Sequence, residues 1–415
     1  MPGRRLPWII GLVAFLAALP AAGGEGPSRA EARLEAAAQE FAAARFGVEL
    51  RTDPALRAVA REHALLAASG VVVDTQEFLR QAESAHGILD PYPYVFYGSA
   101  AASDVAEIER RLLRACADFA PSERRLYTHV AVGVVERRRG WLRHEGQDYV
   151  TVLLTQRAVS FAPLPAESRP GDRVLFEGEV HAPFRDPEIL LTRPDGNTEV
   201  LDNLALEPRH FRCYLRFDRG AGEYQLEVMG RYDLGPRVLG LGSLYPRPAG
   251  ELSAHERLLA AAQNGTLEAV RAAAAPAQEP RTEAEAEARL VLLVNRDRRR
   301  SGLPELEPDT ELAALARAHS RDMRDHAFFA HVSPQSGRLA DRAERGGVRY
   351  RRLAENIAVD SDVDAAEAAL LRSPGHRLNL LSPQFTRLGV GVAFDADAQG
   401  NRRAHVTQVF LLPAP

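Results

Sequence analysis

The stretch Ser373-Pro374-Gly375-His376-Arg377-Leu378-Asn379-Leu380-Leu381 predicts the start of a helix that carries a histidine in its first turn. Ser373 can cap the helix, Pro374 suits its first position, and an apolar run follows. The positive end of the helix dipole disfavours an imidazolium ion, so the ring of His376 is expected to be neutral. A metal ligand or a general base requires a neutral imidazole, which makes His376 a candidate site residue.

Two upstream segments carry a second histidine and a carboxylate, which are further candidate site residues. Phe328-Phe329-Ala330-His331-Val332-Ser333-Pro334 places a histidine just after a predicted helix and beside a Ser-Pro turn. Ala354-Glu355-Asn356-Ile357-Ala358 places a carboxylate at a break in a charged stretch. The chain contains no H-E-x-x-H, G-x-S-x-G, P-loop or dinucleotide-binding motif. Any site must therefore be assembled from distant parts of the chain.

Together with their neighbours, these motifs resemble the CAP superfamily (cysteine-rich secretory proteins, antigens and pathogenesis-related proteins, also called SCP-like), in its bacterial branch. The resemblance covers essentially all of 283–412. It implies an α-β-α sandwich, in which a central antiparallel sheet lies between helical layers. Its further motifs are Gly302-Leu303, Ala316-Arg317, His319-Ser320, Leu388-Gly389-Val390-Gly391-Val392 and Thr407-Gln408-Val409-Phe410.

The resemblance also implies a solvent-facing cleft of two histidines and two acidic residues, which binds zinc in some members. Here His331 and His376 match the histidines and Glu355 the first acid. Glu367 is the one candidate for the second acid, in a shortened segment that lacks the usual tryptophan. Asn356 is expected to tie down backbone around the cleft. Two imidazoles and one carboxylate with an open position form a ligand set of catalytic zinc, so Zn²⁺ bound by His331, Glu355 and His376 is the predicted cofactor.

Other interpretations of the same residues stay open. Without metal, Glu355 beside a histidine could transfer protons. A purely structural interpretation has His331 and Glu355 hydrogen-bonded across the cleft, where they would hold a loop over the sheet. An apolar groove near Phe328, Phe329 and Phe385 could capture lipid, although these rings are better explained as core.

Composition and the N-terminus indicate where the chain acts. The 415 residues carry a net charge of −4, which argues against a nucleic-acid partner. The absence of lysine excludes Schiff-base and P-loop lysine chemistry. Cys116 and Cys213 are too few for a disulfide framework or a cysteine zinc cage. Residues 1–24 are typical of a signal peptide, since Arg4 and Arg5 precede a short apolar run and then small residues. We expect a secreted or periplasmic protein with no transmembrane segment after cleavage.

The chain divides into further segments by composition. After the signal peptide at 1–24, we expect a degenerate CAP-like domain at 29–164, an immunoglobulin-like β-sandwich at 165–248, a helix and linker at 249–281, and the CAP domain at 282–412. The fold class is therefore α+β.

The degenerate domain is inferred from an internal repeat. Asp53-x-x-Leu56-x-x-Val59-Ala60-Arg61-x-His63 matches Asp309-x-x-Leu312-x-x-Leu315-Ala316-Arg317-x-His319. Val132-Gly133-Val134 then matches Val390-Gly391-Val392, and Thr155-Gln156 matches Thr407-Gln408. Three matches in the same order at nearly constant spacing indicate that the two segments share one fold.

These observations predict an exported CAP-domain protein whose C-terminal cleft binds a divalent metal or a small ligand in a binding or scaffold role. Its partner would be an extracytoplasmic protein, the cell envelope or a lipid. The alternative is an extracytoplasmic zinc-dependent hydrolase that acts on peptide, cell-wall or lipid substrates.

Overall fold

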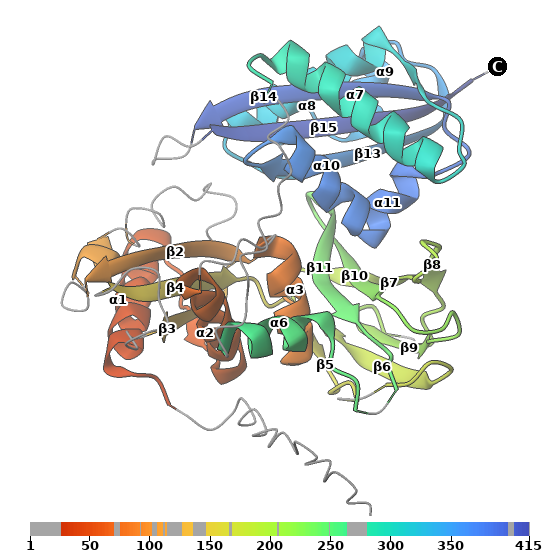
Figure 1. Ribbon diagram of the computed structural model, residues 1–415. Helices are drawn as coiled ribbons and strands as arrows, with labels where there is room; N and C mark the ends of the chain where they lie inside the picture. The colour runs from red at the N-terminus through yellow and green to blue at the C-terminus, as the bar shows by residue number, and fades with distance from the viewer. Residues whose placement is uncertain are drawn as a thin grey trace, which may run out of the picture.

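The computed structural model has three parts, which lie at the lower left, the lower right and the top of Figure 1. It describes residues 26–69, 75–91, 93–101, 106–110, 113, 127–135, 147–165, 168–205, 207–248, 250–263, 280–396 and 402–414. The predicted signal peptide, Cys116 and nearly all of the predicted linker at 272–281 lie outside these residues.

The N-terminal part is a four-stranded sheet between helices. The strand order is β1-β3-β4-β2, with β1 parallel to β3 and the other pairs antiparallel. Helix α1 packs on one face of the sheet, while α2, α3 and α6 pack on the other. The elements are α1 (Arg29–Phe46), β1 (Arg51–Thr52), α2 (Pro54–Ala68), α3 (Thr75–Ala85), β2 (Tyr94–Ala101), β3 (His129–Val135), β4 (Gln147–Thr155) and α6 (Ala254–Gln263).

The middle part is a β-sandwich whose first strand begins at Val159, before the predicted boundary at 165. One antiparallel sheet has the order β11-β10-β7-β8 and the other has the order β5-β6-β9, and inward residues of both sheets share one core. A turn at 194–197, whose sequence Pro-Asp-Gly-Asn is typical of turns, joins β7 to β8. The strands are β5 (Val159–Phe161), β6 (Arg173–Val180), β7 (Arg185–Thr192), β8 (Thr198–Leu201), β9 (His210–Arg216), β10 (Tyr224–Tyr232) and β11 (Gly235–Leu244).

The C-terminal part is the predicted α-β-α sandwich. Its sheet has the order β12-β14-β15-β13, with β12 parallel to β14 and the other pairs antiparallel. Helices α7, α10 and α11 cover one face, and α8 and α9 cover the other. The elements are α7 (Glu283–Arg300), β12 (Glu307–Pro308), α8 (Thr310–Asp325), α9 (Leu339–Arg345), β13 (Tyr350–Asp360), α10 (Val363–Arg372), α11 (Pro374–Leu380), β14 (Arg387–Ala396) and β15 (Arg402–Pro413).

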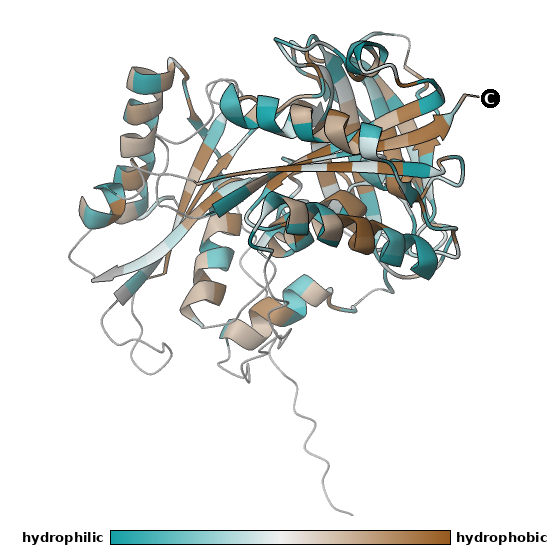
Figure 2. Ribbon diagram, turned by 90° about the horizontal axis from the view of Figure 1, so that it is seen from above, coloured by the Kyte–Doolittle hydropathy of each residue, from teal (hydrophilic) through white to brown (hydrophobic). Residues whose placement is uncertain are grey.

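Local sequence signals set where these helices begin. Thr282 and Glu285 form a reciprocal capping box at the start of α7, which satisfies two backbone N–H groups that the first turn would leave unpaired. Asp309 caps α8 through the N–H groups of Glu311 and Leu312. Figure 2 shows apolar residues along the strands and polar residues on the helices that face solvent.

The register of the first sheet corrects one predicted match. Gly133 pairs with Thr151 across β3 and β4, and Gly391 pairs with Thr407 across β14 and β15. By strand pairing, Thr151 has the register position in the first sheet that Thr407 has in the C-terminal sheet, whereas the sequence comparison matches Thr155 to Thr407. A sequence comparison without the strand pairing could not place this residue, because β4 is rich in threonine and valine.

The helix that follows the sandwich is shorter in the described residues than the sequence indicates. The amphipathic pattern predicts helix over 251–271, and α6 occupies Ala254–Gln263, with 264–279 outside the described part. Leu259 and Ala262 of α6 are buried in the N-terminal core. This helix therefore belongs with the first part of the chain rather than with a free linker.

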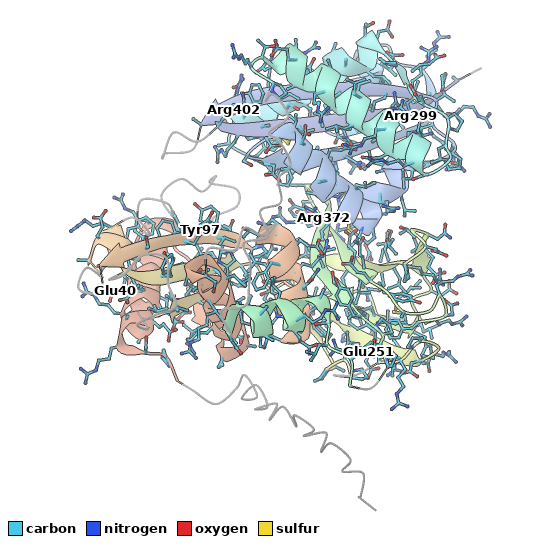
Figure 3. The ribbon with its side chains drawn as sticks, in the orientation of Figure 1. Glu40, Tyr97, Glu251, Arg299, Arg372 and Arg402 are labelled. Carbon is cyan, nitrogen blue, oxygen red and sulfur yellow. The ribbon has the colours of Figure 1, made fainter. Side chains whose placement is uncertain are left out.

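The three parts touch one another. The backbone N–H of Leu241 in β11 donates to Leu89 O, at 2.8 Å, and so joins the sandwich to the N-terminal part. Arg372 lies where the C-terminal part meets the others (Figure 3), with its Nε 3.9 Å from Glu77 Oε2 of α3. None of the described helices is long and apolar enough to cross a membrane.

Candidate functional site

His331 and Glu355 are brought together by the loop after α8 and by strand β13. His331 Nδ1 lies 3.0 Å from Glu355 Oε1. The His331 side chain is 20% exposed, and that of Glu355 is 3% exposed. The loop is held by Ser333, whose hydroxyl donates to Asp322 and accepts the N–H groups of Gln335 and Ser336. The predicted Ser-Pro turn thus fixes the position of His331.

Arg342 of α9 is the partner of Glu355 that the sequence did not reveal. Its Nη2 donates to both carboxylate oxygens, at 3.1 and 2.9 Å, and to His331 O at 3.1 Å. Burial alone would raise the pKa of Glu355, but the His331 hydrogen bond and the Arg342 charge outweigh it and lower the pKa. Glu355 is therefore an ionised acceptor, so the proton it shares with His331 is carried by Nδ1.

His376 lies in the first turn of α11, as predicted. Burial, together with the charge of His331, lowers its pKa to about 3. The ring of His376 is therefore neutral. The main cause is burial and not the helix dipole on which the sequence-based expectation rested. His376 Nδ1 lies 2.8 Å from Ser373 Oγ. Within the described part of the chain, the Nε2 atoms of His331 and His376 have no hydrogen-bond partner.

Ser373 occupies the N-cap position but does not cap the helix with its side chain. Its hydroxyl donates instead to Glu227 Oε2 of the middle part, at 2.5 Å. Glu227 Oε1 accepts the backbone N–H of Gly375 at 2.9 Å. A side chain from a different domain therefore caps α11, and no local pattern in the sequence could have indicated this contact.

Asn356 is fully buried and supports the backbone of the site. Its Nδ2 donates to His376 O at 3.1 Å and to Gln408 Oε1 at 3.3 Å, while its Oδ1 accepts from Asn379. This agrees with the predicted role in tying down backbone. The same burial leaves Asn356 no surface with which to contact a ligand.

Glu367 is not brought to His331. It lies buried in α10, where its Oε2 accepts from Gln408 Nε2. Burial raises the pKa of Glu367 to about 8. His319 is fully buried, its Nε2 is 3.1 Å from Ala330 O, and burial lowers its pKa to about 4. His319 is therefore a core residue.

The predicted metal-ligand set fits the structure only in part. A metal ion needs free lone pairs, and both Glu355 oxygens already accept from the cation Arg342. Among the described residues, no group of three or more His, Cys, Asp or Glu side chains could hold a metal ion. The two imidazoles do fit, because each has its Nδ1 tied to an oxygen and its Nε2 unpaired within that part.

A strand connection of the middle part lies beside His331. Val332 N donates to Leu234 O at 3.1 Å, and a Cβ atom on Gly235 would lie 3.2 Å from His331 Cβ. Leu234 packs on the buried cluster of Met323, Phe328, Ala330 and Ile357. The site is thus bounded by the turn between β10 and β11, and is not the fully solvent-facing cleft that the resemblance implies.

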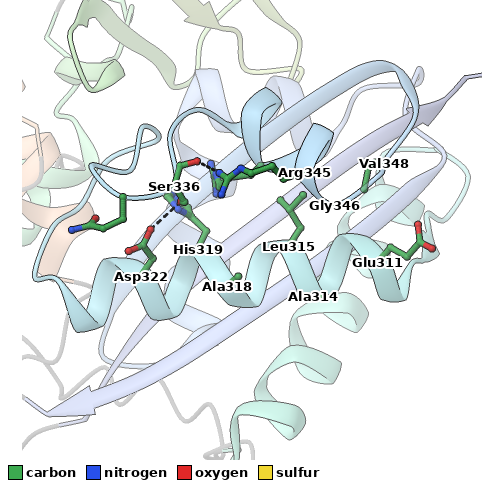
Figure 4. A pocket seen from close by; sticks show the side chains of 12 residues that line it. Glu311, Ala314, Leu315, Ala318, His319, Asp322, Ser336, Arg345, Gly346 and Val348 are labelled. Atoms are coloured by element: carbon green, nitrogen blue, oxygen red, sulfur yellow. Dashed lines mark hydrogen bonds between the residues drawn. The ribbon is translucent and has the colours of Figure 1, made fainter.

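A separate pocket of about 530 Å³ lies between α8 and α9 (Figure 4). His319 and Arg342 form part of its wall, together with Leu315, Asp322 and Arg345. Because these two residues also contact or approach Glu355, the pocket and the candidate site share a wall.

Comparison with known proteins identifies the C-terminal part. The model of the CAP family, the cysteine-rich secretory protein family, matches residues 291–410. The uncharacterized membrane protein YlbC of Bacillus subtilis (strain 168) is 43% identical over 107 residues, which are 26% of this chain and 31% of that protein. The uncharacterized protein YkwD of the same strain is 40% identical over 106 residues, which are 25% and 41%. The chain therefore spans less than half of the length of either relative. Residues 291–410 form a CAP domain.

Solved structures with a likeness to this chain also include proteins of this family. An extracellular protein containing an SCP domain from Bacillus anthracis str. Ames is 20% identical, covers 61% of this chain and 86% of its own, and has a TM-score of 0.28. A cysteine-rich secretory protein from Staphylococcus aureus subsp. aureus Mu50 is 13% identical, covers 61% and 83%, and has a TM-score of 0.26. Similarity this low does not bear on function.

Proposed function

We propose that the chain is an exported binding protein whose CAP domain holds a divalent transition metal, of which Zn²⁺ is the example to test, through the Nε2 atoms of His331 and His376. Export is inferred from the signal-like residues 1–24. The observation that carries the proposal is the state of the two imidazoles. Each is tied at Nδ1 to an oxygen, and this is how metal-binding histidines are oriented.

Glu355 acts in this proposal as an orienting group rather than as a ligand. Its hydrogen bond keeps the His331 ring in place, and Arg342 compensates its charge. The bound metal would supply an open coordination position to a partner or small ligand. The partner would be a component of the cell envelope, another extracytoplasmic protein or a lipid.

A binding role is better supported than zinc-dependent hydrolysis. A hydrolase would need a base close to the metal, and the nearest carboxylate to His331 is Glu355. The lowered pKa of Glu355 and its bonds to Arg342 make this group a weak base. No observation on the described residues supplies another base at the site.

We also infer that residues 29–164 are a degenerate CAP-like domain. The strand order and directions of its sheet equal those of the CAP domain. Gly133 lies against the backbone of Ala60 and Arg61, as Gly391 lies against Ala316 and Arg317. The position of Glu355, which pairs with Val409, corresponds to Val95, which pairs with Leu153. This domain therefore lacks the acid of the candidate site, which favours a supporting role.

Calorimetric titration of Zn²⁺ into the exported chain, from residue 25, tests the function. We expect one-to-one binding that is lost in the double variant His331→Ala/His376→Ala. His326→Ala is the matched control, because this histidine lies on the same loop, is about half exposed and pairs with Asp322. Absence of site-specific heat in the unsubstituted chain, or equal binding by the double variant, would contradict the proposal.

A further inference from the structure

Glu227 is a buried acid that enters the CAP domain from another domain. It belongs to β10, where Leu226 and Val228 on either side of it point into the sandwich core. Glu227 therefore lies on the opposite face of the sheet, against α11, and its exposed fraction is 0%. No arginine or histidine pairs with it in the described part of the chain. Among the described residues, its two oxygens accept from Ser373 Oγ and Gly375 N alone.

Counting protons along this contact fixes the state of His376 whenever Glu227 is ionised. A carboxylate can only accept, and the hydroxyl of Ser373 has one proton, which it donates to Glu227. The hydroxyl therefore has no proton left for His376 Nδ1, which lies 2.8 Å away. The bond between them must be donated by Nδ1–H, so the neutral ring carries its lone pair on Nε2.

We propose that Glu227 is a positioning residue of the candidate site: acting through Ser373, this glutamate of the middle domain holds His376 in the tautomer whose Nε2 is free to bind. The tautomer itself follows from the hydrogen bonds, whereas what Nε2 binds rests on the proposed function. The candidate site is thus shared by two domains. Glu355 acts directly on His331, and Glu227 acts on His376 through a hydroxyl.

The isosteric variant Glu227→Gln should reverse the tautomer. The N–H of Gly375 requires an oxygen at the position of Oε1, so the new amide places its NH₂ group toward Ser373. Ser373 Oγ then accepts from that NH₂ group and donates its own proton to His376 Nδ1. The ring proton consequently moves to Nε2, which loses its lone pair.

Nitrogen NMR of the histidine-labelled chain, from residue 25 and free of metal, tests this. The spectrum is recorded at about pH 8.5, because burial raises the pKa of Glu227 to about 7. The His376 signal is assigned by its loss in His376→Gln. We expect a pyridine-type Nε2 in the unsubstituted chain and in the control Glu188→Gln, whose acid is about half exposed on β7 of the same sheet. We expect a pyrrole-type Nε2 in Glu227→Gln.

Ser373→Ala provides a second variant in case Glu227→Gln does not fold. It removes the hydroxyl acceptor, so the population with the proton on Nδ1 should fall, which a purely structural role of Glu227 does not predict. A pyrrole-type Nε2 in the unsubstituted chain would overturn the inference. An unchanged tautomer in both variants, Glu227→Gln and Ser373→Ala, would overturn it as well.

Zinc affinity separates this inference from the proposed function. Second-sphere substitutions of this kind typically weaken metal binding by about 10- to 100-fold, and we expect a loss of this order in Glu227→Gln. If the tautomer reverses while zinc binding is unchanged, His376 is not a ligand, and the positioning role of Glu227 stands. If the unsubstituted chain binds no zinc but has the expected tautomer, only the proposed function fails.

Discussion

Arg342 determines what Glu355 can do. A carboxylate as buried as this one would normally take up a proton, because the interior solvates its charge poorly. The guanidinium, itself only 5% exposed, compensates that charge and keeps the acid ionised. The same pairing occupies a lone pair on each carboxylate oxygen and places a positive charge where a metal cation would have to bind. One arginine therefore changes the acid from a ligand into a group that orients His331.

Glu367 shows the opposite behaviour, which leads to a pH-dependent prediction. Burial raises its pKa to about 8 from an ordinary value of 4.5, so the folded state binds the proton more tightly than the unfolded state. The stability from this group is full below about pH 4.5 and is lost as pH rises to about 8. We expect Glu367→Gln to have the same unfolding free energy as the unsubstituted chain at about pH 5, and to be more stable by roughly 4 kcal/mol at about pH 9.

Hydrogen exchange of β15 amides measures that difference, because these amides open with the sheet that Glu367 covers. Glu344→Gln is the control, since this acid is exposed on α9 of the same domain. A gain for Glu367→Gln that is equal at both pH values would show that the acid is not protonated in the folded chain.

At the scale of elements, Gly391 allows α8 to lie directly on β14. A Cβ atom at this position would come within 2.1 Å of Arg317 N, which is backbone and cannot turn away. We expect Gly391→Ala to force the helix off the strand and to lower the unfolding free energy of the CAP domain by roughly 3 kcal/mol. The measurement is native-state hydrogen exchange of β14. Gly98→Ala, at a strand position with open space, should cost far less.

Contacts between elements also explain how much of the site could be predicted from the sequence. The motifs place His331, Glu355 and His376 because each lies in a short segment whose own pattern fixes its local structure. Glu227 and Arg342 escaped prediction because their roles arise from packing between elements distant in the chain. An acid between Leu226 and Val228 is the sole trace of Glu227 in the sequence, and it does not identify the residues that Glu227 contacts.

Prediction of the fold shows the same limit. Composition indicates a β-domain at 165–248; β6 to β11 lie in this range, while β5 lies before it. The strand register that separates Thr151 from Thr155 depends on pairing across β3 and β4, and sequence spacing alone does not determine it.

At the scale of the whole molecule, the middle domain is part of the candidate site. Glu227 reaches α11, Arg377 Nε donates to Gly196 O at 3.2 Å, and Leu234 packs near His331. These contacts bury polar and apolar groups of both domains together. An isolated CAP domain would lack Glu227, which acts on His376 through Ser373, and Leu234, which packs near His331.

This arrangement predicts that Leu234 controls access to His331. Its side chain packs on Met323, Phe328, Ala330 and Ile357. Leu234→Ser should weaken this apolar contact, which holds the turn between β10 and β11 against the CAP domain. We expect the reaction of His331 with diethylpyrocarbonate, followed by mass spectrometry, to become severalfold faster, because this reagent needs an unprotonated and accessible ring nitrogen. Val200→Ser, at an exposed position of β8, should leave the rate unchanged. The rate of the exposed His326 in the same samples provides the reference, and an unaltered ratio of the two rates in Leu234→Ser would mean that the turn does not restrict access to the site.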